Sequence, residues 1–521
     1  MSPQYLSPGV YVEEVDKGSK PIEGVGTSVA AFVGFAERGP MNQPTFIANW
    51  GQFVNVYGGF LPGGYLAHAV YGYFNNGGGS CYVSRLPGVE GEGGGAEIMT
   101  QAALPSKAQP SIETFIVSAL EAGVPAGEMI VEITKATGPD IPEDRFNLIV
   151  RRGGKEEVFD NLSLKKGKGV RNVLDVVNKE SQLIRIAEKP TQLGTAEKIP
   201  AEGKYALAPV KTRALMVKEI TPDALVGDAA ARSGVAGFEL ADDVTMLCVP
   251  DLMALYQAGK VSGEGVKAVQ LALLSHCTNM KDRFAIIDCL PNMNPQQVKD
   301  WRMNDAGYDS KYGALYYPWI KVTNPLGNGE SMFIPPCGHM AGIYARSDTQ
   351  RGVHKAPANE IVQGALGLEM QITKSEQDAL NPVGINCIRA FPGRGIRAWG
   401  ARTISSDPSW RYINVRRLFN FVEKSIEVGT QWVVFEPNDM DLWERIKRDI
   451  TAFLTRVWRD GALFGATPGE AFYVKCDEEL NPPAVRDVGQ VIIEIGMAPV
   501  KPAEFVIFRI SQWAGGGAVA E

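Results

Sequence analysis

The pattern of hydrophobic and polar residues predicts a β-strand near each end of the chain, from a spacing of two between valines in the first segment and from a short apolar run in the second. The first segment, PGVYVEEV, covers residues 8–15, and the second, EFVIFRI, covers residues 504–510. A polar run, DKGSKPIEGVGTS, follows the first segment, and a Gly-rich tail follows the second. Because no nearby sequence could form a hairpin with either strand, we expect both strands to be donated to sheets elsewhere.

The pattern between the two ends changes several times. Residues 28–90 alternate apolar strands with short helices, which is typical of an α/β domain. Residues 91–212 begin with a Gly-rich stretch and continue as alternating runs separated by Gly, Pro and Asp turns, which predicts an inserted all-β domain. In residues 213–380 the apolar strands DVTMLCVPD and RFAIIDCLP flank an amphipathic helix, and this order predicts a parallel pair of strands with a helical crossover.

Residues 381–503 contain two strongly amphipathic segments and then strands. VRRLFNFVEKSIEVG predicts one helix that ends at Gly429, and NDMDLWERIKRDITAFLTRVWRDG predicts a second that begins at Asn438 or Asp439 and ends at Gly461. The fold class is therefore a multi-domain mixture of α/β and α+β parts. We expect an arm and linker at 1–27, an α/β body interrupted by the β insertion, a domain at 381–503, and a terminal strand and tail at 504–521.

Composition adds only broad limits. The 521 residues are enough for several domains, and 21% charged residues with a net charge of -7 describe a mildly acidic soluble protein with no indication of nucleic acid. The seven cysteines are scattered without a CxxC pair, so we expect free thiols. The beginning of the chain does not resemble a signal peptide, and no apolar run approaches the roughly 18 residues of a membrane span.

Motifs for cofactors and metals are weak. The chain has no P-loop motif, and GVGTS at Gly24 lacks both the preceding strand and the third glycine of a dinucleotide loop, so a flexible hinge is favoured there. Cys337 and His339 are two residues apart and His354 follows, but a structural histidine is favoured over a metal ligand. We expect no cofactor and no metal site.

A serine protease is the sharpest catalytic alternative. Asp288 ends an apolar strand, GHMAG contains His339, and GTSVA contains Ser28, each faintly similar to a motif of subtilisin-like proteases. The order of these residues differs from the protease order, however, and the later GTQWV offers Gln431 in place of a nucleophile. We therefore expect a middle domain of subtilisin-like arrangement without catalytic residues, and a hydrolase stays as an alternative.

Arginines are concentrated between Cys387 and Arg417, where the sequence has no lysine and one acidic residue. An all-arginine set indicates ordered planar contacts to carboxylates, carbonyls or aromatic rings. The favoured interpretation places these contacts within the domain or between copies of the chain; an acidic partner protein comes second and nucleic acid last. The arginines are Arg389, Arg394, Arg397, Arg402, Arg411, Arg416 and Arg417.

Several of these segments, taken together and in order, resemble one family. They are PGVYVEE, VGFAERGP, FNNGGGSCYVSRL, GINCIRAFPGRGIRAWGART, WRYINVRRL, QWVVFEPND and PAEFVIFRI. As a set they resemble the tail sheath proteins of contractile phage tails and related contractile injection systems. The inserted domain matches least. Both arms lie on one chain, so the resemblance is to the phage-tail and extracellular-injection branch and not to the two-chain sheaths of type VI secretion.

The resemblance implies a structural function. Sheath subunits form stacked hexameric rings around an inner tube, and contraction drives the tube through a target envelope. The implied partners are other copies of the chain, the tube protein, and baseplate and tail-terminator or cap proteins, with assembly in the bacterial or host cytoplasm. A passive shell or surface-lattice protein is a further alternative. The arms would add strands to sheets of neighbouring subunits, and the arm residues are Val10, Tyr11, Val12, Glu13, Glu14, Val15, Phe505, Val506, Ile507, Phe508, Arg509 and Ile510.

The family arrangement also implies that the domain built from the two chain ends lies innermost and that the β insertion projects outward. Basic residues of the inner domain then become candidates for contact with an acidic tube or with neighbouring subunits. These candidates are Arg389, Arg394, Arg397, Arg402, Arg416, Arg417, Arg445, Lys447, Arg448, Arg456 and Arg459.

Overall fold

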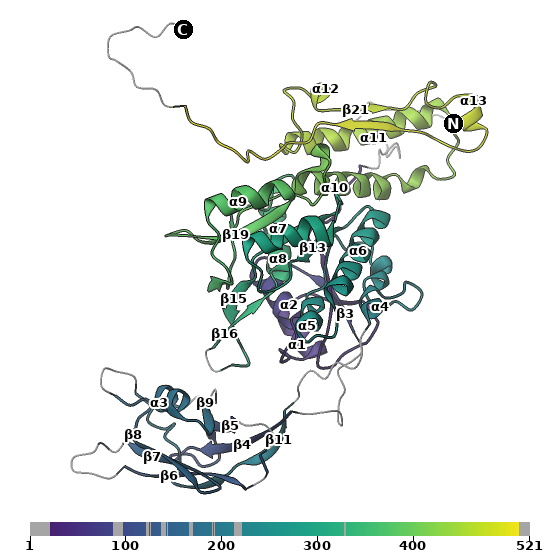
Figure 1. Cartoon of the computed structure of the whole chain (residues 1–521). Helices are drawn as coiled ribbons and strands as arrows, with labels where there is room; N and C mark the ends of the chain where they lie inside the picture. Colours follow the sequence, from purple (N-terminus) through teal and green to yellow (C-terminus); the bar gives the residue numbers. More distant parts are fainter. Residues whose placement is uncertain are drawn as a thin grey trace, which may run out of the picture.

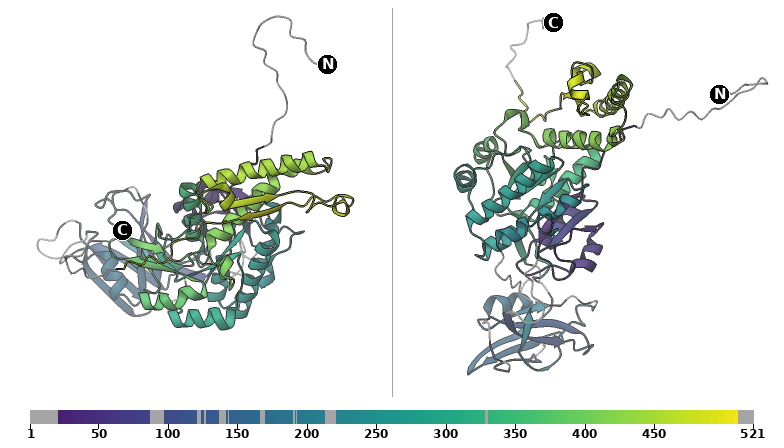
Figure 2. Two further views of the ribbon diagram at one scale, coloured as in Figure 1. Left: turned by 90° about the horizontal axis from the view of Figure 1, so that it is seen from above. Right: turned by 90° about the vertical axis from the view of Figure 1, so that its right-hand side faces the viewer.

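The computed structural model shows three parts arranged in a row, with an α/β body in the middle, a β domain at one end and a helical domain at the other (Figures 1 and 2). The predicted strand at residues 8–15 lies outside the described residues, and so does Ile510. The structure describes residues 21–86, 97–120, 124–125, 127–136, 142, 144–165, 170–189, 191, 193–212, 221–327 and 330–509.

The α/β body, residues 28–86 and 221–404, is built on a central sheet of nine strands within the described residues. The six inner strands, from β3 to β19, are parallel, and the strands at both edges are antiparallel. Inner strands such as AAFVG are buried along their whole length, because helices cover both faces of the sheet. Across the sheet the order is β17 (Glu360–Ile361), β20 (Gly395–Ala398), β19 (Ile385–Phe391), β14 (Gly313–Tyr317), β13 (Phe284–Asp288), β12 (Met246–Cys248), β1 (Ala30–Gly34), β3 (Cys81–Arg85) and β2 (Thr45–Ile47).

Helices of the body come from both sides of the insertion in the chain. They are α1 (Trp50–Tyr57), α2 (Leu66–Asn75), α4 (Pro222–Val226), α5 (Asp251–Gln257), α6 (Gly263–Met280), α7 (Pro295–Asp300), α8 (Cys337–Arg351) and α9 (Lys374–Leu380). A small antiparallel sheet of β15 (Ile320–Thr323), β16 (Ser331–Ile334) and β18 (Gly367–Leu368) lies beside them. The predicted helical crossover between parallel strands is confirmed by α6, which connects β12 to β13.

The predicted domain boundary at residue 381 is wrong. β19 and β20 lie beyond it in sequence, yet they belong to the central sheet, where β19 pairs with β14. Ile385, Cys387 and Ile388 of INCIRAF are buried in the body core, which gives this strand its place. The turn that precedes it is a short 3-10 segment at Asn381–Val383 and not a linker between domains.

The inserted domain, residues 97–212, holds two antiparallel sheets of four strands each within its described part. Its core is separate from that of the body. The all-β expectation omitted α3 (Val173–Glu180), which Asn172 caps and which buries Val173 and Val177. One sheet contains β10 (Gly203–Ala206), β6 (Met129–Lys135), β7 (Phe146–Arg152) and β8 (Lys155–Leu162), and the other contains β11 (Ala208–Thr212), β4 (Glu97–Pro105), β5 (Glu113–Ala119) and β9 (Ile184–Glu188).

The C-terminal domain, residues 413–500, contains the two predicted amphipathic helices. α10 (Ile413–Gly429) connects it to the body, because Ile413 is buried in the body core while Leu418 and Val422 are buried in the domain's own core. α11 (Met440–Arg459) begins after Asp439, whose carboxylate accepts a hydrogen bond from the Leu442 amide. The remaining elements are α12 (Pro468–Ala471), β21 (Phe472–Lys475), α13 (Pro483–Arg486) and β22 (Glu494–Met497).

Candidate inter-subunit sites

The residues of the protease alternative do not form a catalytic site. Asp288 is the last residue of β13, whereas Ser28 precedes the start of the parallel strand β1, so the two lie at opposite edges of the sheet. The Asp288 carboxylate instead accepts a hydrogen bond of 2.9 Å from the Cys337 amide at the start of α8. Burial raises the pKa of Asp288 to about 7. Its visible function is to cap a buried helix.

The GHMAG motif is a helix-packing feature. Gly338 and His339 lie in the first turn of α8, which crosses α2 closely. A Cβ atom on Gly338 would clash with the backbone of Ala69, and one on Gly72 would clash with the ring of His339. Burial lowers the pKa of His339 to about 3, so this imidazole is neutral at physiological pH.

The usual ligand position of a parallel α/β sheet is filled by a side chain of this chain. Ligands bind beyond the carboxyl ends of the strands where the strand order reverses, which here is between β1 and β12. The fully buried carboxylate of Asp251 occupies this place and accepts hydrogen bonds from the amides of Phe35, at 2.6 Å, and Leu66, at 3.2 Å. A Cβ atom on Gly34 would clash with the same carboxylate.

The described residues contain no cluster of three or more His, Cys, Asp or Glu side chains suited to a metal ion. All seven cysteines are buried free thiols, as predicted. No helix in the described part of the chain combines the length and apolar character needed to cross a membrane.

The described part of the C-terminal arm, residues 504–509, does not form a strand within its own subunit. This part runs away from the C-terminal domain as an extended segment (Figure 1). Phe505, Val506, Ile507 and Phe508 are 71%, 68%, 80% and 82% exposed. Four consecutive exposed apolar residues in extended conformation need a partner surface to cover them.

Glu504 anchors this arm to the α/β body. Its carboxylate accepts two hydrogen bonds from the Arg402 guanidinium, at 2.9 and 2.7 Å, and further ones from Asn381 at 2.6 Å and Tyr412 at 3.1 Å. Burial alone would raise the pKa of Glu504, but the bonds from Arg402 and Asn381 outweigh it and hold the pKa below its usual value. The point where the arm leaves the subunit is therefore fixed.

The expected flexible hinge at GVGTS is wrong for the described part of that segment. Ile22 is fully buried against α10 and α11, and its carbonyl accepts a hydrogen bond from Arg456. The Val25 amide donates to the Ser425 hydroxyl at 3.1 Å, and the Thr27 carbonyl accepts from Arg417 at 2.8 Å. These bonds hold residues 21–28 against the helices of the C-terminal domain.

β21 and β22 form a sheet of only two strands in the described chain. The pair packs on α11, and each strand has one edge without a strand partner among the described residues. An isolated two-stranded sheet is only marginally stable, and its open edges can accept further strands. This small sheet is the best candidate in the subunit for receiving a donated arm.

Three of the candidate contact arginines are buried within the subunit, which corrects their assignment. Arg417 donates to both carboxylate oxygens of Asp348, at 2.9 and 2.6 Å. Arg416 donates to Glu423 at 2.9 Å, and its guanidinium stacks 4.4 Å from the ring of Trp410. The third is Arg402, the partner of Glu504. Such arginines stabilise the subunit and are not available to a tube or a neighbouring copy.

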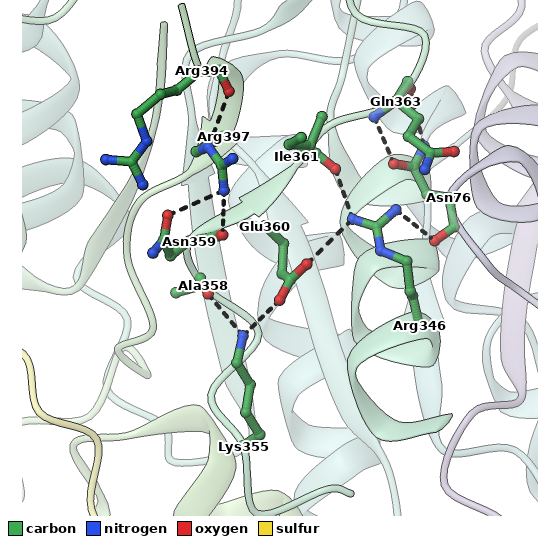
Figure 3. A network of polar contacts seen from close by, with 10 residues as sticks. All are labelled: Asn76, Arg346, Lys355, Ala358, Asn359, Glu360, Ile361, Gln363, Arg394 and Arg397. Atoms are coloured by element: carbon green, nitrogen blue, oxygen red, sulfur yellow. Dashed lines mark hydrogen bonds and ion pairs between the residues drawn. The ribbon is translucent and has the colours of Figure 1, made fainter. Parts of the chain in front are cut away.

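The arginines of the β19–β20 hairpin are partly committed as well. Arg389 donates to Gln377 at 2.8 Å. Arg397 donates to the Asn359 carbonyl at 2.7 Å (Figure 3). Arg394 is exposed at the hairpin turn, and its guanidinium extends away from these bonds (Figure 3). Of the hairpin set, Arg394 is the most accessible.

The same network fixes the short edge strand β17. Arg346 of α8 donates to the carbonyls of Ile361, at 2.7 Å, and Asn76, at 3.1 Å, while Lys355 binds Glu360 at 2.8 Å (Figure 3). A two-residue edge strand bounded by such contacts is a poor template for a donated strand. The body edge is therefore a weaker acceptor than the β21–β22 pair.

The basic residues of α11 remain accessible. Arg445, Arg448, Arg456 and Arg459 are exposed and Lys447 is half-buried. Arg445 stacks on Trp432 at 4.5 Å, Lys447 pairs with Glu444, and Arg456 holds the carbonyl of Ile22. The α11 helix thus presents cations on a rigid element.

Two family models match adjacent parts of this chain. The phage tail sheath protein central domain matches residues 248–404, and the phage tail sheath C-terminal domain matches residues 405–512. Together they cover just over half of the chain. The chain therefore belongs to the phage tail sheath family.

Curated relatives agree with this assignment. The tail sheath protein of Vibrio phage KVP40 is 31% identical over 183 residues, which are 34% of this chain and 26% of that protein. The tail sheath protein of Escherichia phage P2 is 25% identical over 261 residues, which are 48% of this chain and 61% of that protein. The chain spans less than two thirds of the length of either relative.

Solved structures are similar over nearly the whole chain. Two of them are the helical sheath of the anti-feeding prophage in its contracted state and the contracted sheath complex of the extracellular contractile injection system PVC. Each has a TM-score of 0.58 and 23% sequence identity, and covers 98% of this chain and 99% of that one. At this identity the similarity is one of fold.

Proposed function

We propose that this chain is the structural subunit of a contractile sheath. Copies polymerise as stacked hexameric rings around an inner tube, and contraction of the polymer drives the tube through a target envelope. Membership of the tail sheath family and the similarity in fold to two contracted sheaths support this proposal. Assembly takes place in the cytoplasm before the particle is released.

The single observation that carries the proposal is the exposed apolar arm fixed at Glu504. Each arm adds its strand to the β21–β22 sheet of a neighbouring subunit, so that backbone hydrogen bonds connect subunits that can still move relative to one another. At about 1 kcal/mol net for each hydrogen bond, plus the burial of Phe505 to Phe508, such a link contributes several kcal/mol.

The remaining partners follow from the arrangement of the three parts. The C-terminal domain lies innermost, and the cations of α11 face an acidic tube. The inserted domain, at the opposite end of the molecule (Figure 1), faces outward. The chain also contacts a baseplate, since two similar structures are of the anti-feeding prophage baseplate.

A truncation tests the proposal. The full chain, expressed with its tube protein, should form helical sheaths visible by negative-stain electron microscopy. A chain that ends at Glu504 should give folded subunits with an unchanged circular dichroism spectrum and no sheaths. Sheaths of normal length from the truncated chain would contradict donation by the C-terminal arm.

A further inference from the structure

The loop between α10 and α11 carries an aromatic residue in an unfavourable position. Phe435 has a backbone φ of +71°, in the left-handed region that is unfavourable for a residue with a Cβ. Its side chain is also 102% exposed, so no contact within the subunit compensates for the strain. Val434 and Met440 beside it are exposed too. An exposed apolar group held in a strained conformation indicates a contact with a partner.

A second loop extends this apolar surface. The Asn438 side chain donates a 2.9 Å hydrogen bond to the Gln490 carbonyl, which joins the α10–α11 loop to the loop that follows α13. Val488 and Ile492 of the latter loop are exposed. The far end of the C-terminal domain therefore exposes several apolar side chains among charged ones, and Phe435 is the most exposed of them.

The same chain contains a cavity that matches this side chain. It has a volume of about 200 Å³ and lies between α10 and the amino-terminal edge of the central sheet. A cavity of roughly 150 Å³ with apolar walls is enough to hold a benzene ring. Apolar groups in its lining include Val25, Val29, Val244, Val353, Phe421 and Val428.

Charges of both signs lie around each of the two features, since Lys424 and Arg417 also line the cavity and Glu436 follows Phe435 in the loop. Asp242 and Asp243, both exposed, lie in the lining of the cavity on the side of the body. Arg445 lies beside the Phe435 loop, where it stacks on Trp432 and is 3.8 Å from Glu436. Arg445 can therefore meet the carboxylates at the cavity, while Glu436 beside Phe435 can meet Lys424.

We propose that Phe435 of one subunit inserts into the cavity between α10 and the body of a second copy of this chain. Because a protruding residue and a cavity at different places on one chain give a head-to-tail contact, repetition builds a ring or a helix. The contact would connect the C-terminal domain of one copy to the junction between body and C-terminal domain in the next. This inference rests on the proposed polymerisation and adds an interface separate from the donated strands.

The substitution Phe435→Gly tests it without threatening the fold. Glycine adopts a positive φ without strain, so the melting temperature should equal or exceed that of the native chain. The concentration needed for sheath assembly should rise roughly tenfold or more. Val158→Ala, at an exposed position of the inserted domain, is the matched control and should change neither value.

Assembly of the Phe435→Gly chain at the native concentration would overturn this inference and leave the proposed function intact. Failure of the native chain to polymerise at all would instead contradict the proposed function. The behaviour of the native chain therefore distinguishes failure of this inference from failure of the proposed function.

Cross-linking identifies the cavity as the docking site. Phe435→Cys and Asp243→Cys are placed on chains of different tags, and the two chains are mixed in equal amounts to form the sheath; the native thiols are buried. Oxidation of the assembled sheath should join the two tags, while a pair of Phe435→Cys and Val158→Cys should not. Absence of the expected link in sheaths that contain both chains would overturn the proposal.

Discussion

The Arg402 guanidinium forms a two-pronged ion pair with Glu504, in which both nitrogen–oxygen distances are below 3 Å and both side chains are largely buried. Arg402 belongs to the α/β body, and Glu504 is the first residue of the C-terminal arm. The pair therefore fixes the origin of a segment whose next four residues are exposed and apolar. It is the structural reason why an extended arm can point in a defined direction.

Replacing Glu504 with Gln should weaken assembly. Gln cannot accept both charged hydrogen bonds from Arg402, so the arm is less ordered before it binds and its ordering costs about 1–2 kcal/mol for each residue that is released. We expect a roughly tenfold higher concentration for sheath formation, measured by pelleting. Glu239→Gln, an exposed change in the body, is the control.

The ion pair between Arg402 and Glu504 should make the order of the C-terminal arm depend on pH. Because the pKa of folded Glu504 lies below its usual value of 4.5, the pair contributes stability above that value and loses it as the pH falls further. The protection factors for amide hydrogen exchange in residues 500–509, which correct for the intrinsic pH dependence of exchange, should therefore fall in acid for the native chain. Exchange in the Glu504→Gln chain should already be fast at neutral pH; equal protection in the two chains would show that the pair does not hold the arm.

Substitution of a buried arginine should destabilise the subunit, whereas substitution of an exposed arginine on α11 should mainly weaken binding to the tube. Arg417→Ala leaves Asp348 buried without its partner, so the free energy of unfolding of the subunit should fall by about 3–5 kcal/mol. Arg448→Glu on α11 removes a long ion pair of 3.5 Å with the buried Asp449 and should lower the melting temperature modestly, but its main effect should be weaker binding to an acidic tube, with a reduced dependence on salt. Unchanged co-sedimentation of the Arg448→Glu sheath with tube would place the tube contact elsewhere.

Asp288→Asn separates a structural carboxylate from a catalytic one. The folded chain keeps Asp288 protonated up to a pH of about 7, whereas the unfolded chain releases this proton near pH 3.8. Stability from this group therefore falls as pH rises between these values, on the order of 1 kcal/mol for each pH unit.

The Asp288→Asn variant lacks this titrating group. Its free energy of unfolding, measured by urea denaturation, should therefore rise relative to that of the native chain as the pH increases from 5 to 7. The comparison with the native chain cancels the opposing effect of the buried histidines, whose pKa values are lowered. A hydrolytic activity of the native subunit that disappears in Asp288→Asn would revive the catalytic alternative.

The inserted domain should be dispensable for the polymer. Its core is separate from that of the body, so replacing residues 91–211 with a short Gly/Ser linker should leave a folded subunit. Sheaths of the deleted chain should keep their helical symmetry and have a smaller outer diameter by cryo-electron microscopy. Failure to polymerise, or an unchanged diameter, would show that the insertion is part of the contracting polymer.

Local pattern was sufficient for the elements whose character depends on neighbouring residues. The amphipathic periodicity of α10 and α11 and the cap at Asp439 could be predicted because they repeat over several turns or lie within three residues of the feature they stabilise. The apolar run of β13 was equally clear. These elements form most of the framework around the candidate sites.

Long-range partners could not be predicted in the same way. Arg402 and Arg417 carry identical signals in the sequence, and only the fold brings them to Glu504 and Asp348. The order of β19 within the central sheet was missed for the same reason, since an apolar strand does not specify its neighbour. Phe435 had no signal beyond its place in the family motif, because its exposure and its positive φ depend on how the loop closes.

Cryo-electron microscopy of the sheath formed by the native chain tests the central claim most directly. The account predicts that residues 505–508 of each subunit continue the β21–β22 sheet of a neighbouring subunit as an added strand. A polymer in which this segment folds back onto its own subunit, or in which the β21–β22 pair remains a two-stranded sheet, would contradict the account.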